Sequence, residues 1–232
     1  MRTLIASVLA LLWVVSAPLQ AQNAPVVVEL YTSQGCSSCP PADALLAKLA
    51  RREGVIALAL HVDYWDYIGW KDKFADPKYT ARQKAYARNE GRRMIYTPQM
   101  IVGGKGHVVG HKPMEVIDQI EAARAQSSGV ELSVARSGAK LRISARGSGQ
   151  KARDLSVQLV RYVPEQTVKI TRGENAGRTI DYFNIVTDLR ELTTWDGKGT
   201  LELSANAPGN DPLVVIVQEK GPGRILAAQE LR

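Results

Sequence analysis

Apolar residues near the start of the chain change their spacing in a way that predicts a strand, a helix and a second strand. Val26–Tyr31 and Val55–Val62 are short, nearly continuous apolar runs, as expected for buried strands. Between them, Ala42–Arg52 contains good helix formers and places leucines at helical spacing. A strand, a helix and a strand in this order predict a βαβ unit, in which the two strands pair in parallel.

A hairpin and two helices are predicted next. The short apolar runs Met100–Val102 and His107–Val109 flank a glycine-rich turn, which is typical of a hairpin. Pro113–Arg124 then places apolar residues on one face of a helix. The preceding segment, 63–93, holds half of the aromatic residues of the chain, and a helix is predicted over Pro77–Arg88 within it.

The composition changes at Ala125–Gly129, which is predicted to be a linker. From there to the C-terminus the pattern is one of short apolar strands separated by turn residues. Seven strands of this kind predict an all-β, sandwich-like domain over 130–232, after an α/β domain over 22–126. The expected strands are Glu131–Ala135, Leu141–Ala145, Leu155–Tyr162, Val168–Arg172, Thr179–Val186, Leu201–Ser204 and Leu213–Glu219.

Residues 1–21 have the pattern of a secretory signal peptide. Arg2 precedes the apolar run Leu4–Val15, and Ala21 is a small residue suited to a cleavage point. The run is too short to cross a bilayer as a helix, so a stable membrane insertion is not expected. The alternative is an uncleaved anchor. The pattern predicts an exported protein, periplasmic or secreted, whose mature chain begins near Gln22.

The charge of the chain argues against a nucleic-acid partner. The formal net charge is +7, but the Lys and Arg residues are spread along the chain between acidic residues. A nucleic-acid-binding surface would need a denser stripe of cations.

The two cysteines of the chain, Cys36 and Cys39, form a CxxC motif. In an oxidising compartment such a pair is expected to form a disulfide. A loop of four residues stabilises a fold by only about 2 kcal/mol, against about 4.7 kcal/mol for a loop of about 100 residues. The pair is therefore poorly placed as a structural staple, which favours a redox role.

The predicted position of the motif, between a strand and a helix, gives the two sulfurs different roles. Unpaired backbone N–H groups and the helix dipole are expected to stabilise a thiolate on an exposed Cys36. Cys39, one helical turn further in and shielded, is expected to resolve a mixed disulfide formed by Cys36.

A CxxC motif can also attach haem or bind a metal ion. Covalent haem attachment needs histidine after the second cysteine, where Pro40 stands. Zinc needs further ligands, and the three histidines have no recognised ligand spacing. No metal and no cofactor are therefore expected. A thiolate metal carrier, and a binding module with a structural disulfide, remain as alternatives.

Thr97-Pro98, directly before the strand at Met100, completes an ordered set of features that resembles the thioredoxin superfamily. The resemblance covers about residues 25–126 and implies a thioredoxin-like fold there. It also implies a cis bond before Pro98, a proline ring packed against the cysteine sulfurs, and a Thr97 backbone that binds the substrate peptide. The segments GCSSCPPAD, HVDYWDYIGWKD, YTPQMIVGG and RGENAGR look like a family of secreted thioredoxin-like proteins of undefined function with a C-terminal β domain.

Several further residues have two readings each. Trp65, in the aromatic segment, lines either a peptide groove over Cys36 or a core beneath a loop. A carboxylate of Asp63 or Asp66 serves either as proton acceptor for Cys39 or in a solvated turn. Glu174 and Asn175 belong either to a plain polar turn or to a partner contact. His61 is expected to be a buried core residue.

Together these patterns predict an exported thiol–disulfide oxidoreductase. Cys36 attacks, Cys39 resolves, and Thr97, Pro98 and Trp65 bind the substrate. The expected partners are protein thiols or disulfides and a redox partner protein.

Overall fold

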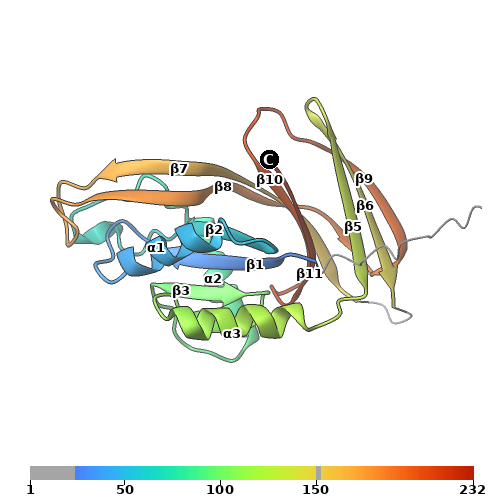
Figure 1. The fold of residues 1–232 in the computed structure, drawn as a ribbon, viewed down its shortest axis with the longest axis horizontal. Helices are drawn as coiled ribbons and strands as arrows, with labels where there is room; N and C mark the ends of the chain where they lie inside the picture. The colour runs from blue at the N-terminus through green and yellow to red at the C-terminus, as the bar shows by residue number, and fades with distance from the viewer. Residues whose placement is uncertain (1–23, 150–152) are drawn as a thin grey trace, which may run out of the picture.

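The computed structural model describes residues 24–149 and 153–232, so the predicted signal peptide lies outside the described residues. Within these ranges strands alternate with helices in the first half, and strands alone make up the second half (Figure 1). The elements are β1 (Val26–Thr32), α1 (Pro40–Leu49), β2 (Val55–His61), the 3-10 turn η1 (Asp66–Ile68), α2 (Pro77–Asn89), β3 (Gln99–Val102), β4 (Gly106–Val109), α3 (Pro113–Arg124), β5 (Val130–Ser137), β6 (Lys140–Ser148), β7 (Leu155–Lys169), β8 (Thr179–Trp195), β9 (Lys198–Asn206), β10 (Leu213–Glu219) and β11 (Ile225–Leu231).

The large sheet contains strands from both halves of the chain. Its order is β11-β10-β7-β8-β2-β1-β3-β4. β1 and β2 pair in parallel over their full length, as the βαβ pattern predicts, and β3 and β4 form the predicted hairpin. The remaining strands, β5, β6 and β9, form a separate antiparallel sheet of three strands.

The expectation of an α/β thioredoxin-like N-terminal domain followed by an all-β, sandwich-like C-terminal domain is therefore wrong. Strands make up 46% of the described residues and helices 18%, and one mixed sheet of eight strands runs through both halves. Four strands that were expected to form part of a sandwich, or that were not expected at all, extend the N-terminal sheet instead. The linker at 125–129 connects α3 to β5, but the sheet continues past it.

The two halves are joined where β8 meets β2. Ala59 and Ile185 pair in parallel there. The Asn184 side chain donates a hydrogen bond to the Ala57 carbonyl at 2.8 Å, and the Tyr79 hydroxyl donates one to the Val186 carbonyl at 3.0 Å. The join therefore depends on side chains as well as on strand pairing.

Helices cover both faces of the large sheet. Leu46 of α1 and Ile120 of α3 pack on one face of the sheet, with Leu30 and Met100 beneath them. Tyr79 and Tyr86 of α2 belong to the apolar cluster on the other face. The three α-helices among the described residues begin at Pro40, Pro77 and Pro113, and they confirm the three helices predicted from the sequence.

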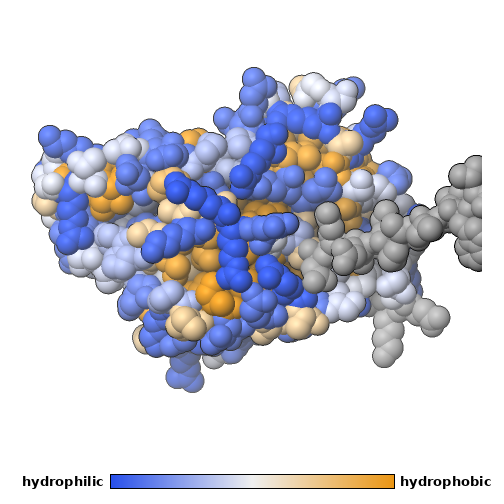
Figure 2. All heavy atoms as spheres, in the orientation of Figure 1, coloured by the Kyte–Doolittle hydropathy of each residue, from blue (hydrophilic) through white to orange (hydrophobic). Residues whose placement is uncertain are grey.

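The three-stranded sheet packs on the part of the large sheet that is made by β7, β10 and β11. Leu141 and Ile143 of β6 share a core with Val157 of β7 and Val215 of β10. Hydrophilic side chains cover much of the surface in Figure 2, with apolar areas between them. Among the described residues, no helix is long and apolar enough to cross a membrane.

Candidate functional site

Cys36 and Cys39 form a disulfide, as the sequence predicts, in the turn between β1 and α1. The Cα atoms are 5.4 Å apart, and the Cys39 N–H bonds to the Cys36 carbonyl at 3.2 Å. Cys36 lies in the loop that follows β1, and Cys39 is the N-cap of α1.

The first turn of α1 offers the sulfurs fewer N–H groups than the sequence analysis expected. Pro40 and Pro41 have no N–H. The N–H groups of Ala42 and Asp43 both bond to the Cys39 carbonyl, at 2.8 and 3.1 Å. The Ser38 hydroxyl, 3.4 Å from the Cys36 sulfur, is a polar group within reach of it.

Cys36 is buried in this oxidised state, which corrects the expectation of an exposed sulfur. Its exposed fraction is 1%, and that of Cys39 is 0%, whereas Ser37 and Ser38 are exposed. Part of the cover comes from the turn between β7 and β8. The Asn175 side chain donates hydrogen bonds to the carbonyls of Gln34 and Cys36, both at 2.9 Å.

The predicted substrate-binding residues Trp65 and Thr97 lie together beside this turn. The indole N–H of Trp65 donates to the Thr97 hydroxyl at 2.7 Å. A Cβ added to Gly35, the residue before Cys36, would lie 3.2 Å from the Trp65 Cβ, so glycine allows the close approach. Trp65 is half-buried, and this position combines features of the groove and core readings.

The Thr97-Pro98 peptide bond is cis, as predicted. Pro98 is buried near the start of α1, because Pro98 and Ala42 each place a Cβ 3.1 Å from the position that a Cβ on Gly110 would occupy. The predicted contact of its ring with the cysteine sulfurs stays a prediction.

A buried carboxyl that the sequence analysis missed lies one helical turn after Cys39. Asp43 is 4% exposed, and its Oδ1 accepts a hydrogen bond from the Thr32 hydroxyl at 2.8 Å. Burial raises the pKa of Asp43 to about 7, against the smaller lowering effects of His61 and of the Thr32 bond. The spacing of four residues from Cys39 along a helix was the sequence signal that could have identified it.

A second buried pair supports the floor of the site. His61 Nδ1 lies 2.7 Å from Asp72 Oδ2, with both side chains fully buried. Burial by itself lowers the pKa of His61, but the charge and hydrogen bond of Asp72 raise it overall. Burial likewise opposes ionisation of Asp72, yet His61 and two backbone N–H groups lower its pKa. Each group thus favours the charged form of the other, and Asp72 also accepts the Gln34 N–H at 2.8 Å.

The two acidic residues considered as proton acceptors have structural roles. Asp63 accepts a hydrogen bond from the Thr80 hydroxyl at 2.5 Å, and Asp66 accepts the Asp72 N–H at 3.1 Å. Both contacts order the segment after β2, in agreement with the turn reading.

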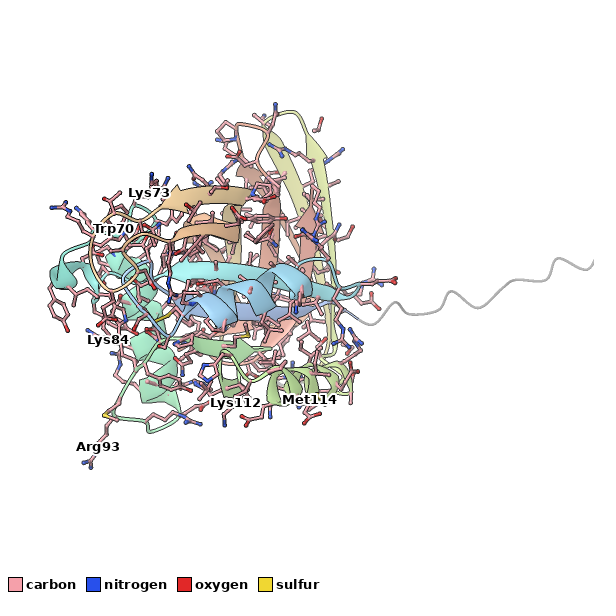
Figure 3. All side chains as sticks on the ribbon, turned by 60° about the vertical axis from the view of Figure 1, so that its left-hand side comes forward. Trp70, Lys73, Lys84, Arg93, Lys112 and Met114 are labelled. Carbon is pink, nitrogen blue, oxygen red and sulfur yellow. A yellow bond between two sulfur atoms is a disulfide. The ribbon has the colours of Figure 1, made fainter. Side chains whose placement is uncertain are left out.

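Exposed apolar and cationic side chains lie on segments next to the site. Tyr67, in η1, is 82% exposed, and Met94, three residues before Thr97, is 80% exposed. In Figure 3, Trp70 and Lys73 lie at the upper left, and Arg93 projects at the lower left. The segments next to Trp65 and Thr97 in the sequence therefore carry exposed side chains that can contact an acidic or apolar partner.

Comparison with known proteins places the chain in a family. The family model described as "Protein of unknown function (DUF1223)" matches residues 27–218. The chain belongs to the DUF1223 family. The DUF1223 match includes the disulfide turn and the Asn175 turn alike, and no curated protein matches the chain.

Two solved structures are similar to this DUF1223 protein. A protein from Agrobacterium tumefaciens has 34% sequence identity and a TM-score of 0.78, over 91% of this chain and 96% of that one. HBP35 of Porphyromonas gingivalis has 14% identity and a TM-score of 0.62, over 90% of this chain and 75% of that one, and shows likeness of fold.

Proposed function

We propose that this DUF1223 protein is a thiol–disulfide oxidoreductase that exchanges disulfides with protein substrates through Cys36 and Cys39. The observation that carries the proposal is the four-residue disulfide with the buried carboxyl of Asp43 one turn behind it. A carboxyl with a pKa of about 7 is protonated in about half of the molecules at neutral pH, so it can both give and take a proton.

The reaction begins from the disulfide. A thiolate of a substrate dithiol attacks the Cys36 sulfur, the Cys36–Cys39 bond breaks, and its electron pair goes to the Cys39 sulfur. A mixed disulfide between substrate and Cys36 forms. The second substrate thiolate then attacks the substrate sulfur of this mixed disulfide, and Cys36 leaves as a thiolate. The substrate is oxidised by two electrons and the Cys36–Cys39 pair is reduced; the same steps run backward reduce a substrate disulfide.

Asp43 supplies the proton in the first step and accepts it in reverse. Asp43 follows Cys39 by four residues, and its N–H bonds to the Cys39 carbonyl, which supports a proton exchange between its carboxyl and the Cys39 sulfur. The Asp43 Oδ2 atom has no hydrogen-bond partner among the described residues, so it is free to exchange a proton.

Thr97 and Trp65 form the substrate side of the site. Backbone groups of Thr97 bind an extended substrate segment, and the Trp65 indole fixes the Thr97 side chain. Pro98 packs behind them near α1. Tyr67 and Met94 provide exposed apolar area for residues that flank the substrate cysteine.

The test separates the roles of the two sulfurs. Cys39→Ser removes the resolving sulfur, so this variant is expected to accumulate mixed disulfides with substrate proteins. Cys36→Ser is the matched control and is expected to trap nothing, because the attacking sulfur is gone. Both variants are recovered from the producing cells and separated by non-reducing electrophoresis.

Trapping by neither variant, with a wild-type disulfide that resists dithiothreitol, would favour the rival function of a binding module with a structural disulfide. Equal trapping by both variants would overturn the assignment of roles. The thiolate metal carrier is tested by metal analysis of the reduced protein. Among the described residues, no three His, Cys, Asp or Glu side chains are placed to hold a metal ion.

Export is part of the proposal. The pattern of residues 1–21 supports it, and the intact mass of mature protein is expected to correspond to a chain that begins near Gln22. A mature mass that includes Leu4–Val15 would contradict export by a cleaved signal peptide.

A further inference from the structure

The turn between β7 and β8, here named the hairpin tip (residues 172–178), contacts the disulfide turn although it lies far from it in the sequence. Its base is firmly packed: Val168, Ile170 and Tyr182 form an apolar cluster with the partly buried Trp70. Gly173 of the tip lies against Trp70, where an added Cβ would be 3.1 Å from the Trp70 Cβ. The two long strands β7 and β8 thus place the tip next to the disulfide turn.

Asn175 is the residue of the hairpin tip that holds the cysteine turn. It is 1% exposed, and its one side-chain nitrogen donates to the Gln34 and Cys36 carbonyls, both at 2.9 Å. These two bonds join residues 141 and 139 positions apart. They clamp the backbone on both sides of Gly35.

The clamp is opposed by polar atoms that its closure leaves unpaired. Asn175 Oδ1 and Gln34 Nε2 are both buried without a hydrogen-bond partner among the described residues. A buried polar atom without a partner loses its bonds to water and gains nothing in return. Opening the tip returns the Asn175 oxygen to water, so part of the cost of breaking the two clamp bonds is recovered.

Glu174 adds a third contact at the exposed edge of the clamp. Its Oε2 accepts the Ser37 N–H at 3.3 Å, directly beside Cys36. Since Pro40 and Pro41 offer no N–H, the Ser37 N–H is one of few nearby donors for a thiolate on Cys36. While the tip is closed, a carboxylate occupies that donor.

We propose that the hairpin tip is a lid over the Cys36–Cys39 disulfide, and that Asn175 is the positioning residue that keeps it closed. The lid deepens the proposed function and rests on it: a substrate thiolate reaches the Cys36 sulfur only after the tip lifts. Opening breaks the two Asn175 bonds and releases the Ser37 N–H from Glu174. The released N–H can then bond to the Cys36 sulfur when it leaves as a thiolate.

The test measures how fast dithiothreitol reduces the disulfide in the native, full-length protein. Reduced cysteines are alkylated at intervals and counted by intact mass. Asn175→Ala is expected to accelerate reduction about tenfold, because two hydrogen bonds that hold the lid closed are lost. Glu174→Gln, which weakens the Ser37 contact without changing shape, is expected to accelerate it a few-fold.

Asn184→Ala is the matched control. Asn184 lies in the same hairpin and also donates to a backbone carbonyl, that of Ala57, but remote from the tip. Its backbone φ is 47°, a left-handed conformation that alanine adopts less readily than asparagine. Asn184→Ala is therefore expected to lose at least as much free energy of unfolding as Asn175→Ala. It is expected to leave the rate of reduction under native conditions unchanged, while urea unfolding shows it to be less stable.

The outcomes separate the lid from the proposed function. A wild-type rate in Asn175→Ala and in Glu174→Gln overturns the lid, as does equal acceleration by Asn184→Ala. If Cys39→Ser traps substrates and Asn175→Ala reacts at the wild-type rate, the function stands and the lid fails. If Asn175→Ala opens the disulfide quickly but Cys39→Ser traps nothing, the lid stands and the oxidoreductase function fails.

Discussion

The Thr32 hydroxyl donates a hydrogen bond to the Asp43 carboxyl at 2.8 Å, and so ties the end of β1 to the first turn of α1 behind the disulfide. The bond orients a carboxyl that is 4% exposed. Burial makes the protonated form of Asp43 the favoured one up to about neutral pH. Two consequences of this arrangement can be measured.

The first is a dependence of stability on pH. The pKa of Asp43 is about 7 in the folded chain and 3.8 without the fold, so the folded chain holds a proton that the unfolded chain has released. The free energy of unfolding is therefore expected to fall, by a few kcal/mol, as the pH rises from about 4 to about 7. Asp43→Asn removes this contribution, so its stability relative to wild type should rise over the same range. Urea unfolding of both oxidised proteins at pH 5 and pH 8 measures the free energy of unfolding. An equal change between the two pH values in wild type and in Asp43→Asn would contradict the prediction.

The second consequence concerns the reaction. Asp43→Asn keeps an oxygen to accept the Thr32 hydroxyl but cannot exchange a proton with Cys39. The mixed disulfide with a model peptide is expected to resolve at least about tenfold more slowly. Asp66→Asn is the control, because Asp66 serves in the turn after β2 and its replacement keeps the oxygen that accepts the Asp72 N–H. Rapid quench followed by non-reducing separation measures the lifetime, and an unchanged lifetime would remove Asp43 from the mechanism.

Trp65→Phe tests the substrate side of the site. The variant loses the hydrogen bond to Thr97 and keeps an aromatic ring beside Gly35. KM for a protein substrate is expected to rise about two- to tenfold, since one hydrogen bond is lost, while kcat changes little. The rate of reduction by dithiothreitol should not change, because that reagent does not use the substrate side. A fall in kcat with an unchanged KM would point to a role in the exchange step instead.

The ion pair between Arg82 and Glu29 is expected to matter for stability alone. Arg82 Nε lies 2.7 Å from Glu29 Oε1, and the Glu29 side chain is 1% exposed. Arg82→Met leaves a buried carboxylate without its cation, which should cost about 3–5 kcal/mol. Arg92→Met, which breaks the exposed contact of Arg92 with Glu90, should cost less than about 1 kcal/mol. Urea unfolding measures the free energy of unfolding of both variants. A loss in Arg82→Met as small as that in Arg92→Met would show that the Arg82 pair is dispensable.

Gly104 tests the contact between the β3–β4 turn and β11. Its φ is +77°, and an added Cβ would overlap the Gly223 carbonyl and lie 2.9 Å from the Ile225 nitrogen. Gly104→Ala is expected to destabilise the fold by more than about 2 kcal/mol, because backbone atoms must move. Gly91→Ala is the control, since it has a similar φ of +69° and open space around it. Equal losses in thermal unfolding would show that φ alone, and not the contact, sets the cost.

The local parts of the site could be predicted from the sequence. A strand followed by Cys36, Cys39 and a helix with prolines in its first turn is determined by residues close in the chain. The cis bond before Pro98 was implied by the position of Thr97-Pro98 before a strand and by the resemblance of this arrangement to the thioredoxin superfamily. The burial of Cys36 could not be predicted in this way, because part of its cover comes from Asn175, which is far away in the sequence and has the pattern of an ordinary turn residue.

The fold of the second half shows the same limit. Val214 and Val215 of β10 are both fully buried, and they face two different cores. A run of apolar residues indicates cover on both faces but does not say what provides it. A sandwich partner was expected, whereas one face packs on the three-stranded sheet and the other lies over the core that includes α2. The pairing of β8 with β2, far apart in the sequence, decides between these arrangements and leaves no local signal.

The long sequence distance between Cys36 and Asn175 has a consequence for the order of biosynthesis. The ribosome adds Asn175 139 residues after Cys36, so a growing chain carries an uncovered cysteine pair through most of its synthesis. During this interval the cysteine turn lacks the two hydrogen bonds from Asn175. The hairpin tip can therefore restrict access to the pair only after the second half of the chain has been made.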